Sequence, residues 1–144
     1  MDVAKGTRDL LSATATVTTD SFLSTYDFGD GDEPAIFTQR GVPEDASTGY
    51  IVISQSGGSS SGYESRGKRG GMMSASVMIV GPNSQSDKKL AAFATKVWQA
   101  LHRGSLTLTG FEEHGMYADM PQRYQDEGIF PAYIINVSVR VLES

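Results

Sequence analysis

The sequence predicts an α+β fold in which one long helix and a short N-terminal helix pack on one face of a mostly antiparallel sheet. One long segment has apolar residues at helical spacing, and several short segments alternate between apolar and polar residues as strands do. The order of these segments holds no repeated strand–helix–strand unit, which favours an antiparallel sheet. The 144 residues fit a single domain, 1–144.

The long helix is predicted from about residue 84 to residue 102. Its apolar positions recur at intervals of three and four: Leu90, Phe93, Ala94, Val97, Trp98 and Leu101. Trp98 lies on this stripe and is interpreted as a residue of the core or its edge rather than a ligand platform. A sparser stripe predicts the short helix over residues 2–12. Residues 13–22 are rich in Thr, Ser and Val and are compatible with an extended segment.

The strand candidates are residues 36–38, 50–54, 72–80, 105–109 and 129–142. In the last of these, Ile135, Val137 and Val139 share one face, while Asn136 and Arg140 lie on the other. A polar stretch over residues 112–128 precedes this terminal strand. We expect the polar face of the terminal strand to be wet, at least in part, or to lie in an interface.

Residues 56–71 have the Ser- and Gly-rich composition of a flexible linker, yet they stand between two similar strands. We therefore predict a flexible hairpin arm here and not a domain boundary. The arm carries the candidate contact residues Tyr63, Arg66, Lys68 and Arg69. Residues 62–69 approach a phosphate-binding loop, but Arg69 stands where that motif needs Ser or Thr, and a strand follows instead of a helix.

The remaining chemical leads each lack a necessary residue, so we predict no enzyme, no cofactor and no metal site. Glu112, His114 and Asp119 have no second histidine nearby to complete a ligand set. The acidic residues of 27–33 lack the spacing of a calcium loop and are interpreted as a solvated turn. His102 is expected to complement the negative end of the helix dipole. The chain has no cysteine, which excludes disulfides and thiolate chemistry.

The net charge and the short apolar runs of the sequence exclude further classes of function. A formal net charge of −5 argues against a general nucleic-acid binder, which needs a basic face. The start of the chain does not resemble a signal peptide, and apolar runs such as Val77–Val80 are too short to cross a bilayer. These features indicate a structural, self-assembling protein with no membrane association.

Three stretches together resemble the tail terminator, or tail-completion, proteins of long-tailed phages, the family of the minor tail protein U of phage lambda. They are residues 42–53, residues 77–101 and residues 123–141, and the resemblance covers most of the chain. The sequence departs from the usual pattern at Gly49, where a proline commonly precedes the aromatic residue. The Ser- and Gly-rich arm is also longer than in that pattern.

The resemblance implies a subunit of a homo-oligomeric ring, expected to be a hexamer, at the head-proximal end of a virion tail. Such a ring stops polymerisation of the tail tube and joins the tail to the head. The implied partners are further copies of the chain, the tail tube protein and the head–tail connector or stopper protein, with the tape measure protein as another candidate. DNA would only pass through the lumen, and assembly would take place in the host cytoplasm.

Two alternatives remain at this point. A head–tail connector, a stopper or another subunit related to the tail tube would have the same structural character. A monomeric α+β module that binds a small ligand beside Trp98 belongs to a different class.

Overall fold

The structure of the protein is a computed structural model, which describes residues 3–20, 22–27, 29, 31–38, 49–59, 64–65, 68–81, 87–102, 111–124 and 132–143. The helices are α1 (Val3–Ser12), α2 (Ala15–Thr18) and α3 (Asp87–Leu101). The strands are β1 (Thr25–Asp27), β2 (Asp32–Pro34), β3 (Ile36–Thr38), β4 (Tyr50–Ser59), β5 (Glu64–Ser65), β6 (Lys68–Val80), β7 (Phe111–Ala118), β8 (Gln122–Tyr124) and β9 (Ala132–Glu143).

The main sheet has the strand order β3-β4-β6-β9-β7, to which β5 adds beside β6 and β8 beside β9. The β3–β4 pair is parallel, and the other pairs of this sheet are antiparallel. Strands β1 and β2 form a separate two-stranded sheet. The predicted α+β class with a mostly antiparallel sheet is therefore confirmed.

Strand β9, the last of the described strands, lies in the interior of the sheet. One of its edges pairs with β6 from Ala132–Val80 to Leu142–Gly70. Its other edge is shared, because β8 pairs with the first part of β9 and β7 with the second part. The longest strands of the sheet, β6 and β9, thus form its centre.

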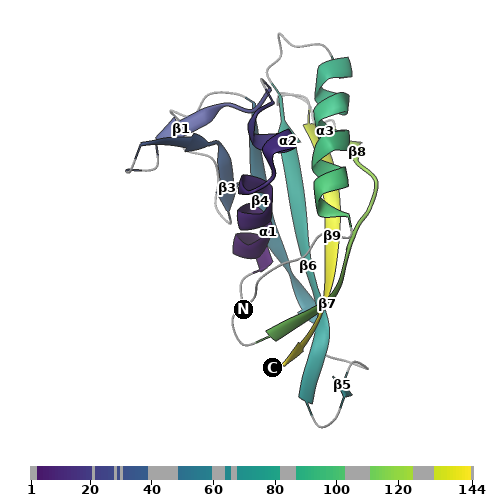
Figure 1. Ribbon diagram of the computed structural model, residues 1–144. Coiled ribbons are helices and arrows are strands. Elements are labelled where there is room, and N and C mark those ends of the chain that lie inside the picture. The colour runs from purple at the N-terminus through teal and green to yellow at the C-terminus, as the bar shows by residue number, and fades with distance from the viewer. Residues whose placement is uncertain are drawn as a thin grey trace.

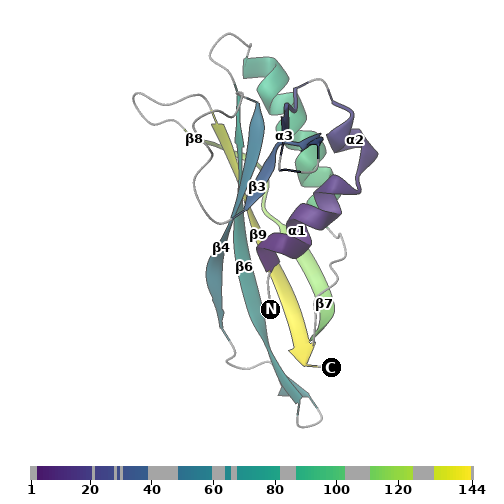
Figure 2. The ribbon, with the colours of Figure 1, turned by 90° about the vertical axis from the view of Figure 1, so that its left-hand side faces the viewer.

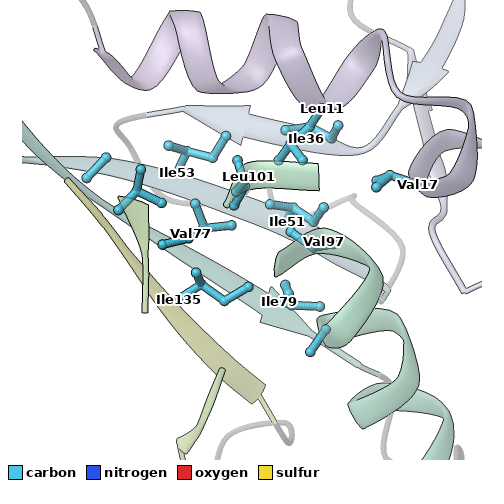
Figure 3. Close-up of a cluster of buried hydrophobic side chains, with 14 of the residues drawn as sticks. Leu11, Val17, Ile36, Ile51, Ile53, Val77, Ile79, Val97, Leu101 and Ile135 are labelled. Carbon is cyan, nitrogen blue, oxygen red and sulfur yellow. The ribbon is translucent and has the colours of Figure 1, made fainter. Parts of the chain in front are cut away.

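All three helices cover the same face of the sheet (Figures 1 and 2). Figure 3 shows side chains from the helices and the strands pointing toward one another between these two layers. Phe93, Val97 and Leu101 of α3 are fully buried there, as predicted from the apolar stripe. Leu11 of α1 and Val17 of α2 extend this core over the β3–β4 side.

The alternation predicted for the terminal strand is confirmed. Ile135, Val137 and Val139 face the helices and are at most 1% exposed, whereas Asn136 and Arg140 are exposed on the opposite face. A strand buried on one face requires this period of two, because successive side chains point to opposite sides.

Residues 13–22 are not an extended segment: the helix α2 lies within them. The hydroxyl groups of Thr18 and Thr19 donate hydrogen bonds to the carbonyl oxygens of Thr14 and Ala15, four residues back, as helical threonines do. Val17 is fully buried in the core. Burial of this one side chain overrides the weak strand preference of its β-branched neighbours.

Strand β7 begins at Phe111 and continues into the stretch over residues 112–128, which was predicted to be polar. Its partner is β9, and the sequence pattern does not reveal that pairing. Strand β6 begins at Lys68, four residues before the predicted start, and β4 continues to Ser59. The predicted strand over residues 105–109 and the first three residues of the predicted long helix lie outside the described residues.

Gly49 has a backbone angle φ of +87°, which L-residues with a side chain rarely adopt. A Cβ atom there would lie 2.5 Å from the carbonyl oxygen of Phe22. The carbonyl oxygen of Gly49 accepts a hydrogen bond from the Ser24 N–H, 2.8 Å away. Proline, whose ring fixes φ near −65°, cannot take this conformation, so the proline that the tail terminator pattern commonly has before the aromatic residue would not fit here.

Candidate assembly surfaces

An acidic hairpin formed by β1, β2 and the turn between them projects from the β3 side of the molecule (Figure 1). Its side chains Asp27, Asp32 and Glu33 are exposed. The carboxylate of Asp27 accepts hydrogen bonds from the N–H groups of Gly29 and Gly31, at 2.8 and 3.4 Å. These bonds order the turn, and the described residues agree with the predicted solvated acidic turn; Asp30 lies outside them.

The acidic hairpin is fixed to the body of the molecule by two contacts. The ring of Tyr26 meets the ring of Phe37 edge to face, with 5.3 Å between centroids. The guanidinium of Arg8 lies 3.8 Å from the carboxylate of Glu33. An isolated two-stranded hairpin is marginally stable in water, so these contacts are needed to hold it in one orientation.

At the end of the main sheet away from β3, side chains from the C-terminal part of α3 cover the outer edge of β7 at Ala118. They belong to Trp98 and to His102, the residue after α3. The indole Nε1–H of Trp98 donates a hydrogen bond to the carbonyl oxygen of Ala118, 2.9 Å away. The Ala118 N–H donates to Nδ1 of His102 at 3.3 Å. Both outward backbone groups of Ala118 are therefore satisfied, which protects the edge from pairing with another strand.

These contacts refine two predictions. Trp98 is half-buried and packs against the core, so its place at the edge of the core is confirmed. His102 stacks on Trp98 with 5.2 Å between ring centroids and accepts a hydrogen bond from a strand. The contacts of His102 thus fix α3 to β7, a role that the predicted interaction with the helix dipole did not include.

Two large apolar side chains are exposed beside this closed edge. Tyr117 is 51% exposed, and its ring meets the His102 ring edge to face at 6.4 Å. Met120, between β7 and β8, is 70% exposed. A few residues later, the Arg123 guanidinium lies over the Tyr133 ring, 5.8 Å from its centroid, while the residue itself is exposed. We call Tyr117, Met120 and Arg123 the β7–β8 edge.

The sheet face opposite the helices has a different character. Neighbouring side chains of β4, β6 and β9 form an apolar row and then a polar row on it: Val52, Met78 and Ile134, followed by Ser54, Ser76 and Asn136. The Ser76 hydroxyl donates a hydrogen bond to the side-chain oxygen of Asn136 at 3.2 Å. Near the N-terminal end of β6, Met72 is 36% exposed, and it is paired with Arg140 of β9.

The predicted arm continues the β4–β6 hairpin away from the helices. Gly58 pairs with Met73 and Ser59 with Met72, after a register shift between Gln55 and Gly58. Lys68 and Arg69 belong to the start of β6, where β5 pairs with them. The other two candidate contact residues, Tyr63 and Arg66, lie outside the described residues, so the contact role of the four stays a prediction.

Within the described part of the chain, no three side chains of His, Asp or Glu are grouped as metal ligands would be. Glu112 and His114 are residues of β7, and the register of that strand shifts between Glu113 and Met116. Among the described helices, none combines the length and the apolar character needed to cross a bilayer.

The β7–β8 edge was not predicted, because residues 112–128 were interpreted only as a polar stretch. The signal was the alternation of Met116 and Ala118 with Tyr117 and Asp119, which places two buried residues between exposed ones. This alternation spans only four residues and is interrupted by Gly115 on its N-terminal side, so it was too short to predict a strand.

No model of a known protein family matches this sequence, and no curated protein matches it. The fold does match a chain in a solved structure described as the virion of a native gene transfer agent particle, with a TM-score of 0.68. The match covers 99% of this chain and 95% of that chain, at 15% sequence identity. The two chains therefore share their fold over almost their whole lengths.

Proposed function

We propose that this protein is a structural subunit of a phage-like virion, and within it the tail terminator, a ring that ends the tail tube and joins it to the head. The observation that carries the proposal is the match in fold to a chain of a gene transfer agent virion over 99% of the present chain. The family resemblance of residues 42–53, 77–101 and 123–141 supports the position at the end of the tail.

The described surfaces suit a subunit of a ring. Such a subunit needs a rigid body and two different contact surfaces, because a ring of identical copies closes through repeated head-to-tail contacts. The three helices and the sheet enclose one fully buried core, which supplies the rigid body. The acidic hairpin lies beside β3, and the β7–β8 edge lies at the other end of the strand order of the main sheet, so the two supply distinct surfaces.

The hairpin arm is proposed to contact the tail tube or a neighbouring subunit through Tyr63, Arg66, Lys68 and Arg69. An arm that orders only on docking loses conformational entropy at that step, so its removal should impair joining while leaving the body folded. Deletion of residues 59–70 leaves Gly71 and Met72 as a two-residue link between Gly58 and Met73, which are already paired.

The proposal is tested by polymerising the tail tube protein of the same particle with and without this protein. We expect electron micrographs to show closed rings at one end of tubes that have stopped growing. Deletion of residues 59–70 should leave the thermal unfolding transition in place but reduce the fraction of capped tubes. Replacing the three basic residues of the arm with glutamine tests the contribution of charge separately.

Three results would count against the proposal. A protein that binds the head connector but leaves tube length unchanged is a connector or stopper. A protein that remains monomeric with the tube, and neither caps it nor binds the connector, is not a virion subunit of this kind. Unchanged tube capping after deletion of the arm would remove the arm from the proposal while leaving the terminator assignment in place.

A further inference from the structure

Among the described residues, the two lateral sides of the molecule expose charged side chains of different sign. The acidic hairpin on the β3 side exposes Asp27, Asp32 and Glu33. On the other side in Figure 1, α3 and β8 carry exposed basic residues, namely Lys88 and Lys89 in the first turn of α3 and Arg123 in β8. Surfaces of opposite charge on opposite sides of one chain attract when copies stand side by side in the same orientation.

The acidic hairpin is built to keep its shape in the absence of a partner. The Asp27 carboxylate orders the turn, and the Tyr26–Phe37 and Arg8–Glu33 contacts fix the strands to the body. A Cβ atom added at Gly29 or Gly31 would meet no atom within 4 Å, so these two positions of the turn face open space. A preorganised projection loses little conformational entropy when it binds, which favours its use as a contact element.

The β7–β8 edge exposes side chains that can anchor a partner, and at Ala118 its outward backbone groups are already satisfied. The exposed side chains of Tyr117 and Met120 are of the types enriched at the centres of protein interfaces. Trp98 and His102 occupy both outward backbone groups of Ala118, which disfavours addition of a strand at that point. A partner that docks beside Ala118 must therefore make its contacts there through side chains, as a compact hairpin can.

We propose that the acidic hairpin of one copy docks on the β7–β8 edge of the next copy, with Met120 and Tyr117 as the apolar centre and Arg123 as the charged contact. Lys88 and Lys89 add attraction at the margin. The inference rests on the proposed ring and names the surfaces that close it. The two surfaces differ and lie on opposite sides of the chain, so the contact repeats from copy to copy and can close by rotation.

The β7–β8 edge also exposes an acidic residue, which should repel the acidic hairpin of the next copy. Its replacement should therefore change association in the opposite direction from replacement of Arg123. Asp119 is exposed between Tyr117 and Met120, where it would meet the acidic hairpin of the neighbour. Like charges brought together at an interface reduce affinity. Asp119→Asn should therefore strengthen association, whereas Arg123→Glu should weaken it.

The experiment measures the concentration at which the full-length protein assembles, by mass photometry and sedimentation velocity at low and high salt. Arg123→Glu and Met120→Ser should each raise this concentration by about tenfold or more. Asp32→Lys should weaken assembly in the same way, and Asp32→Lys combined with Arg123→Glu should restore it. Asp32 is chosen because Asp27 and Glu33 help to hold the hairpin itself.

Arg140→Glu is the matched control, since it makes the same change in charge at an exposed position on the sheet face opposite the helices. It should leave assembly unchanged, and each variant should keep the wild-type unfolding temperature within a few degrees. If wild-type rings form but Arg123→Glu and Met120→Ser assemble normally, or if Arg140→Glu is equally harmful, the named contact is wrong although the ring stands. A wild type that stays monomeric alone and on tail tubes overturns the proposed function as well.

Discussion

The indole of Trp98 donates a hydrogen bond to the carbonyl oxygen of Ala118, 2.9 Å away, and so joins the helix α3 to the edge strand β7. One turn later, Nδ1 of His102 accepts a hydrogen bond from the N–H of the same alanine. Two aromatic side chains one turn apart thus satisfy both outward groups of one strand residue. A half-buried tryptophan needs a partner for its N–H, and this strand edge supplies one.

Trp98→Phe should destabilise the fold by about 0.5–1.5 kcal/mol, because it removes this hydrogen bond while keeping an aromatic ring on the core. Urea unfolding monitored by circular dichroism measures the change. Thr95→Ala on the exposed face of the same helix is the control and should shift the free energy of unfolding by no more than about 0.5 kcal/mol. An equal loss in both variants would mean that the Trp98 contact is not specific.

Asp20 should make stability depend on pH in the acid range. Burial raises the pKa of Asp20, but the hydrogen bonds from Lys96 and from the Phe22 N–H and the charge of Lys96 outweigh it, so the pKa lies below the ordinary value of 3.8. The folded state therefore binds this proton less readily than the unfolded state does. The stabilisation is present above the ordinary pKa and is lost as the pH falls through the lower folded value.

Asp20→Asn should remove that part of the acid sensitivity while keeping an oxygen that can accept from Phe22. Near neutral pH the variant should lose about 0.2–1 kcal/mol, the range of partly exposed ion pairs, since Lys96 is 48% exposed. Unfolding temperatures from pH 7 to pH 3 give both quantities. A steeper loss of stability in acid for Asp20→Asn than for the wild type would contradict the assignment.

Ile135→Val and Ile134→Val compare the two faces of β9 at adjacent positions. Ile135 is fully buried beneath the helices, so removal of one methylene should cost about 0.5–1.5 kcal/mol. Ile134 is half-buried on the face opposite the helices and should lose less than about 0.5 kcal/mol. Equal losses from the two substitutions, measured by urea unfolding, would show that the second face is covered as tightly as the first.

Gly49→Ala should destabilise the fold by about 2 kcal/mol or more. The substitution combines an unfavourable φ of +87° with a Cβ atom 2.5 Å from the Phe22 carbonyl oxygen. Gly29→Ala is the control, because its φ of +116° is also unfavourable but its Cβ atom would meet nothing within 4 Å. The difference in unfolding free energy between the two variants therefore measures the close contact, and no difference would refute it.

Sequence patterns predicted the helices and strands that bury one face and expose the other, because their apolar residues recur at regular intervals. The stripe on α3 and the alternation in β9 both follow from a single buried face, which fixes the spacing of apolar residues. The same rule failed for α2, where one buried valine outweighs the propensities of its neighbours. It could not reveal that β3 runs parallel to β4, because pairing direction depends on the path of the connection and not on the side chains of either strand.

The candidate contact surfaces were predicted only in part. Local composition predicted a solvated acidic turn over residues 27–33 and a hairpin arm over residues 56–71. The β7–β8 edge depends on the packing of Trp98 and His102 against Ala118, which are 16 to 20 residues away in sequence. A contact of that range leaves no periodic trace, so only the structure brings these residues together.

The interior position of β9 has a consequence for how the protein is made in the cell. A nascent chain that has reached β7 already carries all three helices and most of the strands, yet the strand between β6 and β7 is still missing. Until β9 emerges from the ribosome, β6 presents a long unpaired edge, the kind of surface that promotes aggregation. Completion of the sheet is thereby delayed until β9 has been synthesised, and chains truncated before β9 would lack the strand that joins β6 to β7.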